Sequence, residues 1–335
     1  MSQPLRPMNL GEILDRTFQI YRARFLAFVG IAAIPMMALE LVRLADRTWL
    51  HVHSLVHPTG QFQMSAWNFV VGLGFYHIFS VLGILIEPAI VEIASSSALG
   101  DECSITSSLR FALLRWPRYL WLGLLKTLLN LGIPEFVFLL LATGAAFLAD
   151  ATGLLGKEFR WMLLLLALAV VVAGFQLFLW LLACFSFAIP AAALEDRTAF
   201  QSLRRSWTLT KGTRARIWFT WLAVFLTSSL LAWGLSLLLW QIFRLLGSSA
   251  SSMAWTRSLY YASYFILNAA VGTLVLPIFP IALTLFYYDQ RIRHEGFDIE
   301  RMMDVAGLNP PAMLAAEESA AAQQTPLPTE EETLA

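Results

Sequence analysis

Charged side chains are scarce in this chain of 335 residues. They make up 14% of the sequence, against about 25% in an ordinary soluble domain. Hydrophobic residues reach 58%, above the roughly 45–50% of soluble domains, and this imbalance argues against a soluble cytoplasmic enzyme. Acidic and basic side chains are equal in number, 23 of each, so the net charge gives no reason to expect a nucleic-acid partner.

Cysteine is nearly absent too. Cys184 lies in an apolar run and Cys103 in a predicted loop. Two cysteines placed in this way form neither a disulfide framework nor a pair of thiolates at metal-ligand spacing. The sequence therefore gives no support to redox or zinc chemistry, and we expect no cofactor.

Long apolar runs are what the chain has in abundance. Residues 161–190 contain no charged side chain, and this run exceeds the roughly 20 apolar residues that cross a bilayer. The sequence predicts an all-α polytopic membrane bundle of six transmembrane helices. Within the third, a single helix kinked at Ile133-Pro134 is expected, because two separate halves would be too short to cross. The predicted spans are 25–42, 67–94, 118–149, 161–193, 217–243 and 258–288.

The basic residues of the loops predict the orientation. Sixteen of them fall on the side that holds both termini and six on the other, which places both termini in the cytoplasm by the positive-inside rule. Many lie in amphipathic stretches that precede the odd-numbered spans and are expected to rest in the headgroup plane, where each Lys or Arg gains about 1 kcal/mol against anionic lipid. Candidate contacts to anionic lipid are Arg22, Arg24, Arg115, Arg118, Arg204, Arg205, Lys211, Arg214 and Arg216.

These stretches also suggest an internal repeat. When Leu14, Leu109 and Leu203 are aligned, each is followed four residues later by a bulky apolar side chain on the same helical face. The even-numbered spans each carry a proline near the predicted cytoplasmic end, at Pro88, Pro190 and Pro280. We interpret the chain as three related helical hairpins. The alternative is that any membrane bundle places basic amphipathic connectors before its spans.

Three phrases of the sequence resemble a known family. They are Leu10-Gly-Glu-Ile-Leu-Asp-Arg-Thr-Phe-Gln-Ile-Tyr-Arg22, the stretch 194–212 that begins Leu-Glu-Asp-Arg-Thr, and the stretch 286–300 that begins Phe-Tyr-Tyr-Asp-Gln-Arg. Together they resemble the bacterial glycerophosphoryl diester phosphodiesterase membrane domain, over roughly residues 5 to 303. The resemblance implies a membrane fold in a bacterial plasma (inner) membrane and a stand-alone module beside lipid-headgroup hydrolysis. The family's catalytic His-Arg-Gly motif has no counterpart here, so no phosphodiesterase residues carry over.

Ionisable residues inside the spans are the main candidates for a site. Each costs about 2.5–3.5 kcal/mol at a helix centre and usually faces the bundle interior or water. Glu87 and Lys126 both lie roughly 12–13 Å from the cytoplasmic ends of adjacent predicted helices, so we expect them to interact. The pair either fixes helix register or lines a polar cavity open to the cytoplasm. Further acidic residues inside the predicted spans are Glu92 and Glu135.

A weaker candidate is a histidine cluster on the predicted outer side. His51, His53 and His57 lie within seven residues and offer three imidazole ligands to a transition metal. No carboxylate or cysteine lies nearby to complete a site, so a solvated loop is the preferred interpretation and no metal is expected.

Three functional classes follow. The favoured class is a non-catalytic module that docks a partner or acts in lipid- or envelope-associated processes. The alternative is a small transporter or channel with a polar intramembrane cavity. An intramembrane enzyme is least supported, because no catalytic motif occurs in the spans. Membrane lipids are the expected partner, with a separate soluble or membrane protein as a second one. The oligomeric state does not follow from the sequence.

Residues 1–306 form the predicted membrane domain. Residues 307–335 form an acidic cytoplasmic tail whose composition predicts disorder.

Overall fold

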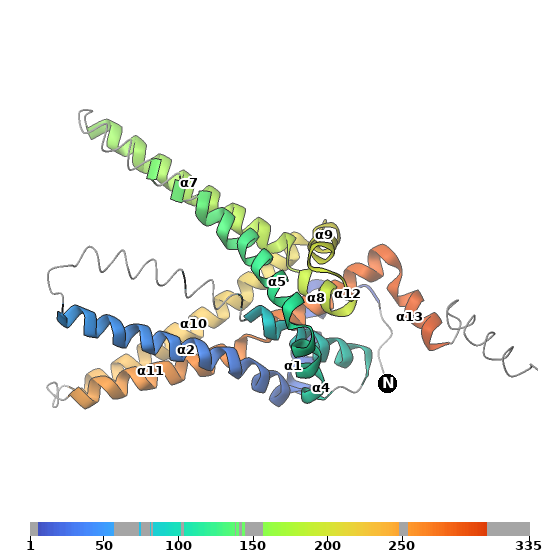
Figure 1. Ribbon diagram of the computed structural model, residues 1–335, viewed down its shortest axis with the longest axis horizontal. Helices are drawn as coiled ribbons and strands as arrows, with labels where there is room; N and C mark the ends of the chain where they lie inside the picture. Colours follow the sequence, from blue (N-terminus) through green and yellow to red (C-terminus); the bar gives the residue numbers. More distant parts are fainter. Residues whose placement is uncertain are drawn as a thin grey trace, which may run out of the picture. The chain divides into compact units, whose positions relative to one another are not determined.

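The computed structural model describes residues 6–56, 74, 81, 83–101, 104–137, 139–140, 143–144, 157–247 and 254–306. Within this part every regular element is a helix, in agreement with the predicted all-α class (Figure 1). The elements are α1 (Leu10–Ala23), α2 (Phe25–Val56), a helix through 83–99, α4 (Ile105–Leu114), α5 (Trp116–Thr127), the π-helical segment Leu128–Gly132, α7 (Lys157–Cys184), α8 (Ala188–Leu194), α9 (Ala199–Leu209), α10 (Arg214–Gly247), α11 (Ala254–Val275), α12 (Ile278–Glu295) and α13 (Phe297–Val305).

Five helical stretches of the described chain are long and apolar enough to cross a membrane. They correspond to the first, third, fourth, fifth and sixth predicted spans. The second predicted span, 67–94, lies mostly outside the described residues, so six spans are not established. The five are Phe25–Leu44, Trp116–Val137, Leu168–Leu194, Arg214–Leu245 and Leu259–Glu295.

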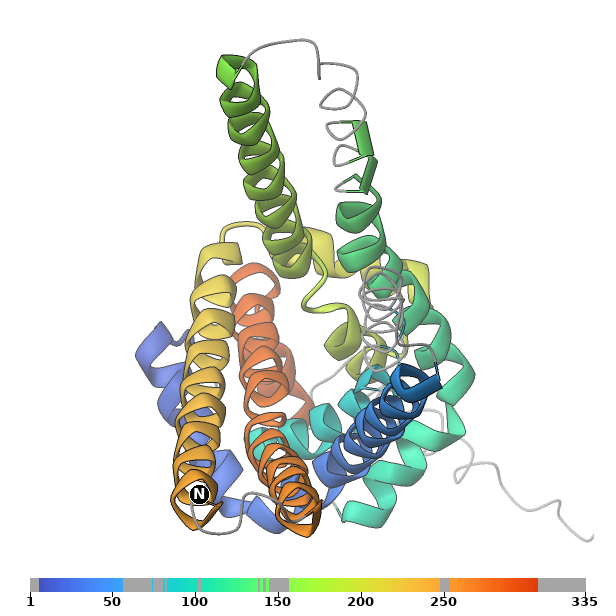
Figure 2. The same ribbon diagram turned by 90° about the vertical axis from the view of Figure 1, so that its left-hand side faces the viewer.

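The predicted domain of residues 1–306 contains two compact units in its described part. The first runs from Asn9 to Tyr287, and the second combines residues 6–8 with 288–306. In the first unit α11 packs against both α10 and α2 (Figures 1 and 2). The predicted tail, 307–335, lies outside the described residues.

The amphipathic stretches before the odd-numbered spans form the short helices α1, α4 and α9. In each, the backbone N–H of the N-cap residue donates to a side chain three residues later, a capping arrangement that fixes where the helix begins. Leu14, Leu109 and Leu203 each lie five residues after their N-cap, so the structure gives them the same position. The three helices gather at the end where α2, α5 and α10 begin (Figure 1). The capping pairs are Asn9 with Glu12, Ser104 with Ser107, and Thr198 with Gln201.

Two of the spans are interrupted just before a proline. A break at 185–187 separates α7 from α8, and a break at 276–277 separates α11 from α12. Pro190 and Pro280 are each the third residue of the helix that follows, where a missing N–H costs no intrahelical hydrogen bond. Pro88 differs, because the described helix continues through it from 83 to 99.

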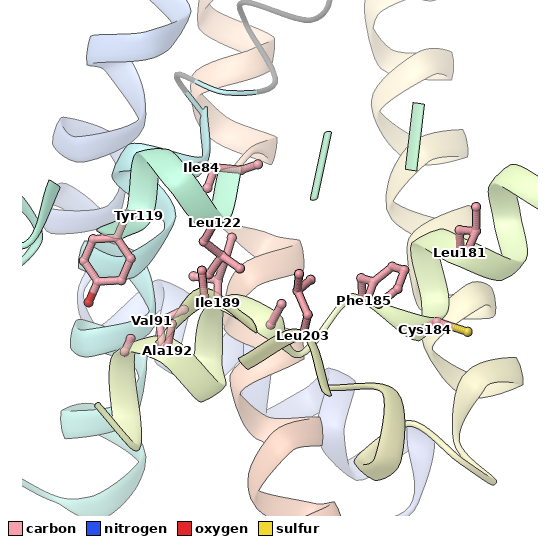
Figure 3. Close-up of a cluster of buried hydrophobic side chains, with 13 residues drawn as sticks. Ile84, Val91, Tyr119, Leu122, Leu181, Cys184, Phe185, Ile189, Ala192 and Leu203 are labelled. Atoms are coloured by element: carbon pink, nitrogen blue, oxygen red, sulfur yellow. The ribbon is translucent and has the colours of Figure 1, made fainter. Parts of the chain in front are cut away.

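The core of the first unit lies where the short helices meet the spans. Small alanine side chains of α8 pack in one cluster with side chains of α5, of the helix 83–99 and of α9 (Figure 3). The labelled core residues are Ile84, Val91, Tyr119, Leu122, Leu181, Cys184, Phe185, Ile189, Ala192 and Leu203.

The second unit is held by polar contacts around Asp289. Its carboxylate accepts hydrogen bonds from the backbone N–H of Met8 at 2.8 Å and from Nε of Arg293 at 2.9 Å. The N-terminal arm is thereby joined to the end of α12. Phe297 of α13 stacks on Tyr288, with ring centroids 5.3 Å apart, which holds α13 against the same helix end.

Candidate functional site

A cavity of about 420 Å³ lies inside the first unit, within the 300–1,000 Å³ range of small-molecule sites. Its walls come from the helix 83–99, α5, the π-helical segment, α7, α10, α11 and α12, all of which contribute to the predicted spans. Most of the lining is apolar. The polar side chains among its described lining residues are Glu87, Lys126, Thr127, Asn130, Ser186, Trp221 and Ser228.

Glu87 and Lys126 meet in this cavity. Nζ of Lys126 lies 3.7 Å from Oε2 of Glu87, and both side chains are 14% exposed. The structure thus brings together the two charges that the sequence placed at similar depth. The separation exceeds the 2.7–2.9 Å of a tight charge-assisted hydrogen bond. The two charges therefore attract each other without forming a tight hydrogen bond.

The π-helical segment Leu128–Gly132 places Asn130 in the same lining. Pro134 has no N–H to donate to the carbonyl of Asn130, and its ring crowds that carbonyl, which is the usual cause of a π-bulge or kink. The backbone N–H of Ile133 accordingly donates to Leu128, five residues back. The helix passes through Ile133-Pro134 without dividing, as predicted.

Two polar atoms beside the ion pair lack a partner within the described chain. Oδ1 of Asn130 and Oγ1 of Thr127 are both buried, and neither makes a hydrogen bond to any described residue. A buried polar atom without a partner costs about 1–3 kcal/mol. Such groups in a cavity lining suggest a place where a bound molecule completes the hydrogen bonding.

The two interrupted spans border the cavity as well. Ser186 lies in the first break, and Leu276 in the second, and both line the cavity. Non-helical backbone at membrane depth is tolerated only where it is buried in protein or lines a cavity. With the π-helical segment, three irregular backbone segments therefore converge on one site.

Side chains of the short helices satisfy backbone groups at these breaks. Oγ of Ser206, in α9, donates to the carbonyl of Cys184 at 2.7 Å and accepts from the backbone N–H of Phe187 at 3.0 Å. The hydroxyl of Tyr21, in α1, donates to the carbonyl of Leu274 at 2.8 Å. Burial raises the pKa of Tyr21, whose hydroxyl is protonated near neutral pH even at its ordinary pKa. The breaks are thus stable features of the fold.

Aromatic side chains form the apolar part of the wall. Trp221 and Phe225 of α10 stack with ring centroids 5.1 Å apart, and Phe178 and Phe279 complete the group. Phe225 borders the cavity while 49% of its surface is exposed, so α10 separates the cavity from the surroundings of the bundle by one layer of side chains.

A second polar cluster lies at the ends of the spans, around Glu195. Its carboxylate accepts hydrogen bonds from Tyr287, from Arg205 at 2.9 Å, and from Arg197. Burial alone would raise the pKa of Glu195, but these hydrogen bonds outweigh it and hold the pKa below its ordinary value. The cluster ties α9 and the turn before it to α12.

The neighbouring Asp196 connects this turn to α5. Its φ of 53° lies in the left-handed region, which non-glycine residues adopt seldom and Asp more readily than most. Oδ1 accepts from Arg118 at 2.6 Å and pairs with Arg115 at 2.8 Å, and these arginines lower the pKa of Asp196. Arg118 also donates to the carbonyl of Ala192 at the end of α8.

Several residues predicted to contact anionic lipid have partners within the protein instead. Arg115, Arg118 and Arg205 bind carboxylates, and Arg214 lies over the rings of Trp180 and Trp207, at 5.4 and 5.1 Å. Arg24 and Arg216 are half-buried. Lipid contact stays a prediction for all nine; those that are well exposed are Arg22, Arg204 and Lys211.

The remaining predicted residues do not join the cavity. Glu92 lies on the helix 83–99 and Glu135 directly after Pro134; both are half-buried and neither is among the cavity's lining residues. His51 and His53 fall at the end of α2, where side chains are not described, and His57 lies outside the described residues. Among the side chains that are described, no group of three or more His, Cys, Asp or Glu is placed to hold a metal ion.

Comparison with known proteins supports one family. Residues 157–311 match the family model described as the membrane domain of glycerophosphoryl diester phosphodiesterase. This range includes the central and terminal phrases on which the resemblance rested but not the N-terminal one. No significant match was found among curated proteins or among solved structures. The chain is thus a multi-pass membrane protein in which residues 157–311 match a membrane domain of this family, and only that domain is detected.

Proposed function

We propose that this chain is a non-catalytic integral membrane module that acts in a lipid- or envelope-associated process and binds an amphiphile from the bilayer in the cavity between its spans. The cavity carries the proposal, because three irregular backbone segments converge on it and it is lined by polar atoms that have no partner among the described residues. In many secondary transporters, the binding site lies where helices are discontinuous. The mixed lining, an ion pair beside an aromatic wall, suits a molecule with a polar head and an apolar body.

The proposal includes the topology expected from the sequence: six spans in three hairpins, both termini cytoplasmic, in a bacterial plasma membrane. The shared end of α1, α4 and α9 supports it, since five of the sixteen basic residues of the predicted inner side lie in these helices (Figure 1). The helix 83–99 supports it as well, because it continues the predicted second span up to its cytoplasmic end.

A pair of glycine substitutions tests amphiphile binding. A Cβ added at Gly83, which lines the cavity, meets no atom within 4 Å, so the side chain of Gly83→Leu begins in open space. Gly30, in α2, has equally open surroundings but does not line the cavity, which makes Gly30→Leu the matched control. We expect lipids that survive detergent purification, identified by native mass spectrometry, to be lost from the Gly83→Leu protein and kept in the control. Retention in both variants would contradict the proposal.

Transport is the second candidate, and the broken spans beside the cavity favour it. Flux of a bound amphiphile between leaflets of a proteoliposome, blocked by Gly83→Leu, would identify a transporter. Binding without flux would identify a static module. Docking of a separate protein, the other partner suggested by the sequence, would leave lipid retention unchanged by Gly83→Leu.

A further inference from the structure

The charges in the cavity restrict the kind of polar head that it can hold. Glu87 and Lys126 are the charged residues among its described lining, one of each sign. Because the 3.7 Å separation leaves them loosely paired, the ammonium keeps hydrogen-bond donors to spare and the carboxylate keeps acceptors.

A ligand with a single charge fits this arrangement poorly. An anion that approaches Lys126 also approaches the carboxylate of Glu87, and a cation at Glu87 also approaches the ammonium of Lys126. At these short distances and away from water, like charges repel strongly. A ligand that carries one charge of each sign avoids this, because each end meets its opposite and the cavity stays neutral.

We propose that the cavity binds a zwitterionic group, with its ammonium end at Glu87 and its oxyanion end at Lys126. This inference rests on the proposed function and names the class of head that the amphiphile carries. The two buried atoms without a described partner suit the same ligand: Oδ1 of Asn130 accepts a hydrogen bond from the ammonium, and the hydroxyl of Thr127 donates one to the oxyanion. The aromatic wall of Trp221 and Phe225 then meets the apolar remainder.

Lipid binding to the purified full chain tests the inference. The probes are short-chain phosphatidylethanolamine, which is zwitterionic, phosphatidylglycerol with the same chains, which is anionic, and free phosphoethanolamine, which has the head without the chains. We expect the zwitterionic lipid to bind at least tenfold more tightly than the anionic one. Binding of free phosphoethanolamine as tight as that of the lipid would also support the inference and would assign a soluble source to the ligand.

Charge-changing variants sharpen the test. Glu87→Gln leaves Lys126 as the single lining charge, so the preference should reverse toward phosphatidylglycerol. In the double variant Glu87→Gln/Lys126→Met the lining is neutral, so it should fold even if the single variants do not, and it should bind both lipids about equally. Glu40→Gln removes a buried carboxylate that pairs with Arg43 in α2, away from the cavity, and should keep the wild-type preference.

The possible failures are distinguishable. If the wild-type protein binds phosphatidylglycerol as tightly as phosphatidylethanolamine, or if the double variant keeps the zwitterionic preference, the inference is wrong while amphiphile binding stands. If neither lipid binds, or if Gly83→Leu changes the binding of neither, the proposed function itself is wrong.

Discussion

The hydroxyl of Tyr287 donates a hydrogen bond to the carboxylate of Glu195, 92 residues earlier in the chain. The contact joins two of the three phrases that resemble the phosphodiesterase membrane domain, the one around Leu-Glu-Asp-Arg-Thr and the one around Phe-Tyr-Tyr-Asp. In the fold it connects α12 to the turn that precedes α9. Both residues lie in the range that matches the family model, 157–311.

Removal of this hydroxyl should destabilise the protein measurably. A hydrogen bond to a charged group contributes about 1.5–3 kcal/mol, and Glu195 keeps its two arginine partners, so we expect Tyr287→Phe to cost about 1.5 kcal/mol. Thermal unfolding in detergent measures the effect. Tyr261→Phe, on an exposed part of α11, is the matched control and should change stability by less than about 0.5 kcal/mol. Equal effects of the two variants would show that the contact does not contribute.

The same cluster predicts a dependence of stability on pH. Because the folded state lowers the pKa of Glu195, its ionised form stabilises the fold. That contribution is complete above the ordinary carboxyl pKa of about 4.3 and disappears as the pH falls through the lowered folded pKa. The stability difference between the wild type and Glu195→Gln should therefore be constant near neutral pH and shrink below about pH 4. A difference that grows on acidification would reverse the predicted sign.

Much of the fold and part of the site could be predicted from local sequence. The positions of five spans follow from apolar runs, and the meeting of Glu87 and Lys126 follows from their similar depth on neighbouring helices. The prolines at 190 and 280 were also visible, yet the breaks before them were not predicted. Proline permits a break, but whether one forms depends on a partner such as Ser206, which satisfies the freed backbone of residues 184–187 from another helix.

The parts that sequence reasoning missed depend on contacts between distant segments. Asn130 is uncharged and lies in an apolar run, so its residue type did not indicate a site. Its position four residues before Pro134 was an available indication of an irregular turn. Arg118 and Arg205 were predicted to contact anionic lipid headgroups. The basic, amphipathic sequence around them does not indicate that the carboxylates of Asp196 and Glu195 lie close to them in the folded chain.

The topology can be tested at the two ends of the chain and at one residue of the predicted outer side. Single cysteines introduced at Ser2 and Thr333 should react with a membrane-impermeant thiol reagent only after the membrane is opened, because both ends are predicted to be cytoplasmic. A cysteine at Gly247, the last residue of α10 and on the predicted outer side, should react in intact cells. Labelling of either terminus from outside would contradict the six-span arrangement.

Hydrolysis of glycerophosphodiesters is expected to be absent from the purified chain. The family's catalytic motif has no counterpart among the chain's five histidines, and the described residues that line the cavity include no histidine. Release of choline from glycerophosphocholine should stay at the level of membranes that carry an empty vector. Turnover that exceeds this control and is lost in the Gly83→Leu variant would place an unrecognised reaction in the cavity. It would contradict the proposal that the chain is a non-catalytic module.

The interaction of Glu87 with Lys126 should appear as coupling in a double-mutant cycle. Glu87→Gln leaves an ammonium without its carboxylate and Lys126→Met leaves a carboxylate without its ammonium, so each should cost on the order of 3 kcal/mol in an apolar interior. The double variant has a neutral cavity and should recover part of the loss. Because polar interactions in membranes are often weak, the coupling has an expected lower bound of roughly 0.6 kcal/mol. Thermal stability in detergent supplies the four measurements. Glu87→Gln and Glu40→Gln change side chains that form separate ion pairs, so their effects on stability should add. If the effects of Glu87→Gln and Lys126→Met also add, the 3.7 Å contact contributes nothing to the free energy of unfolding.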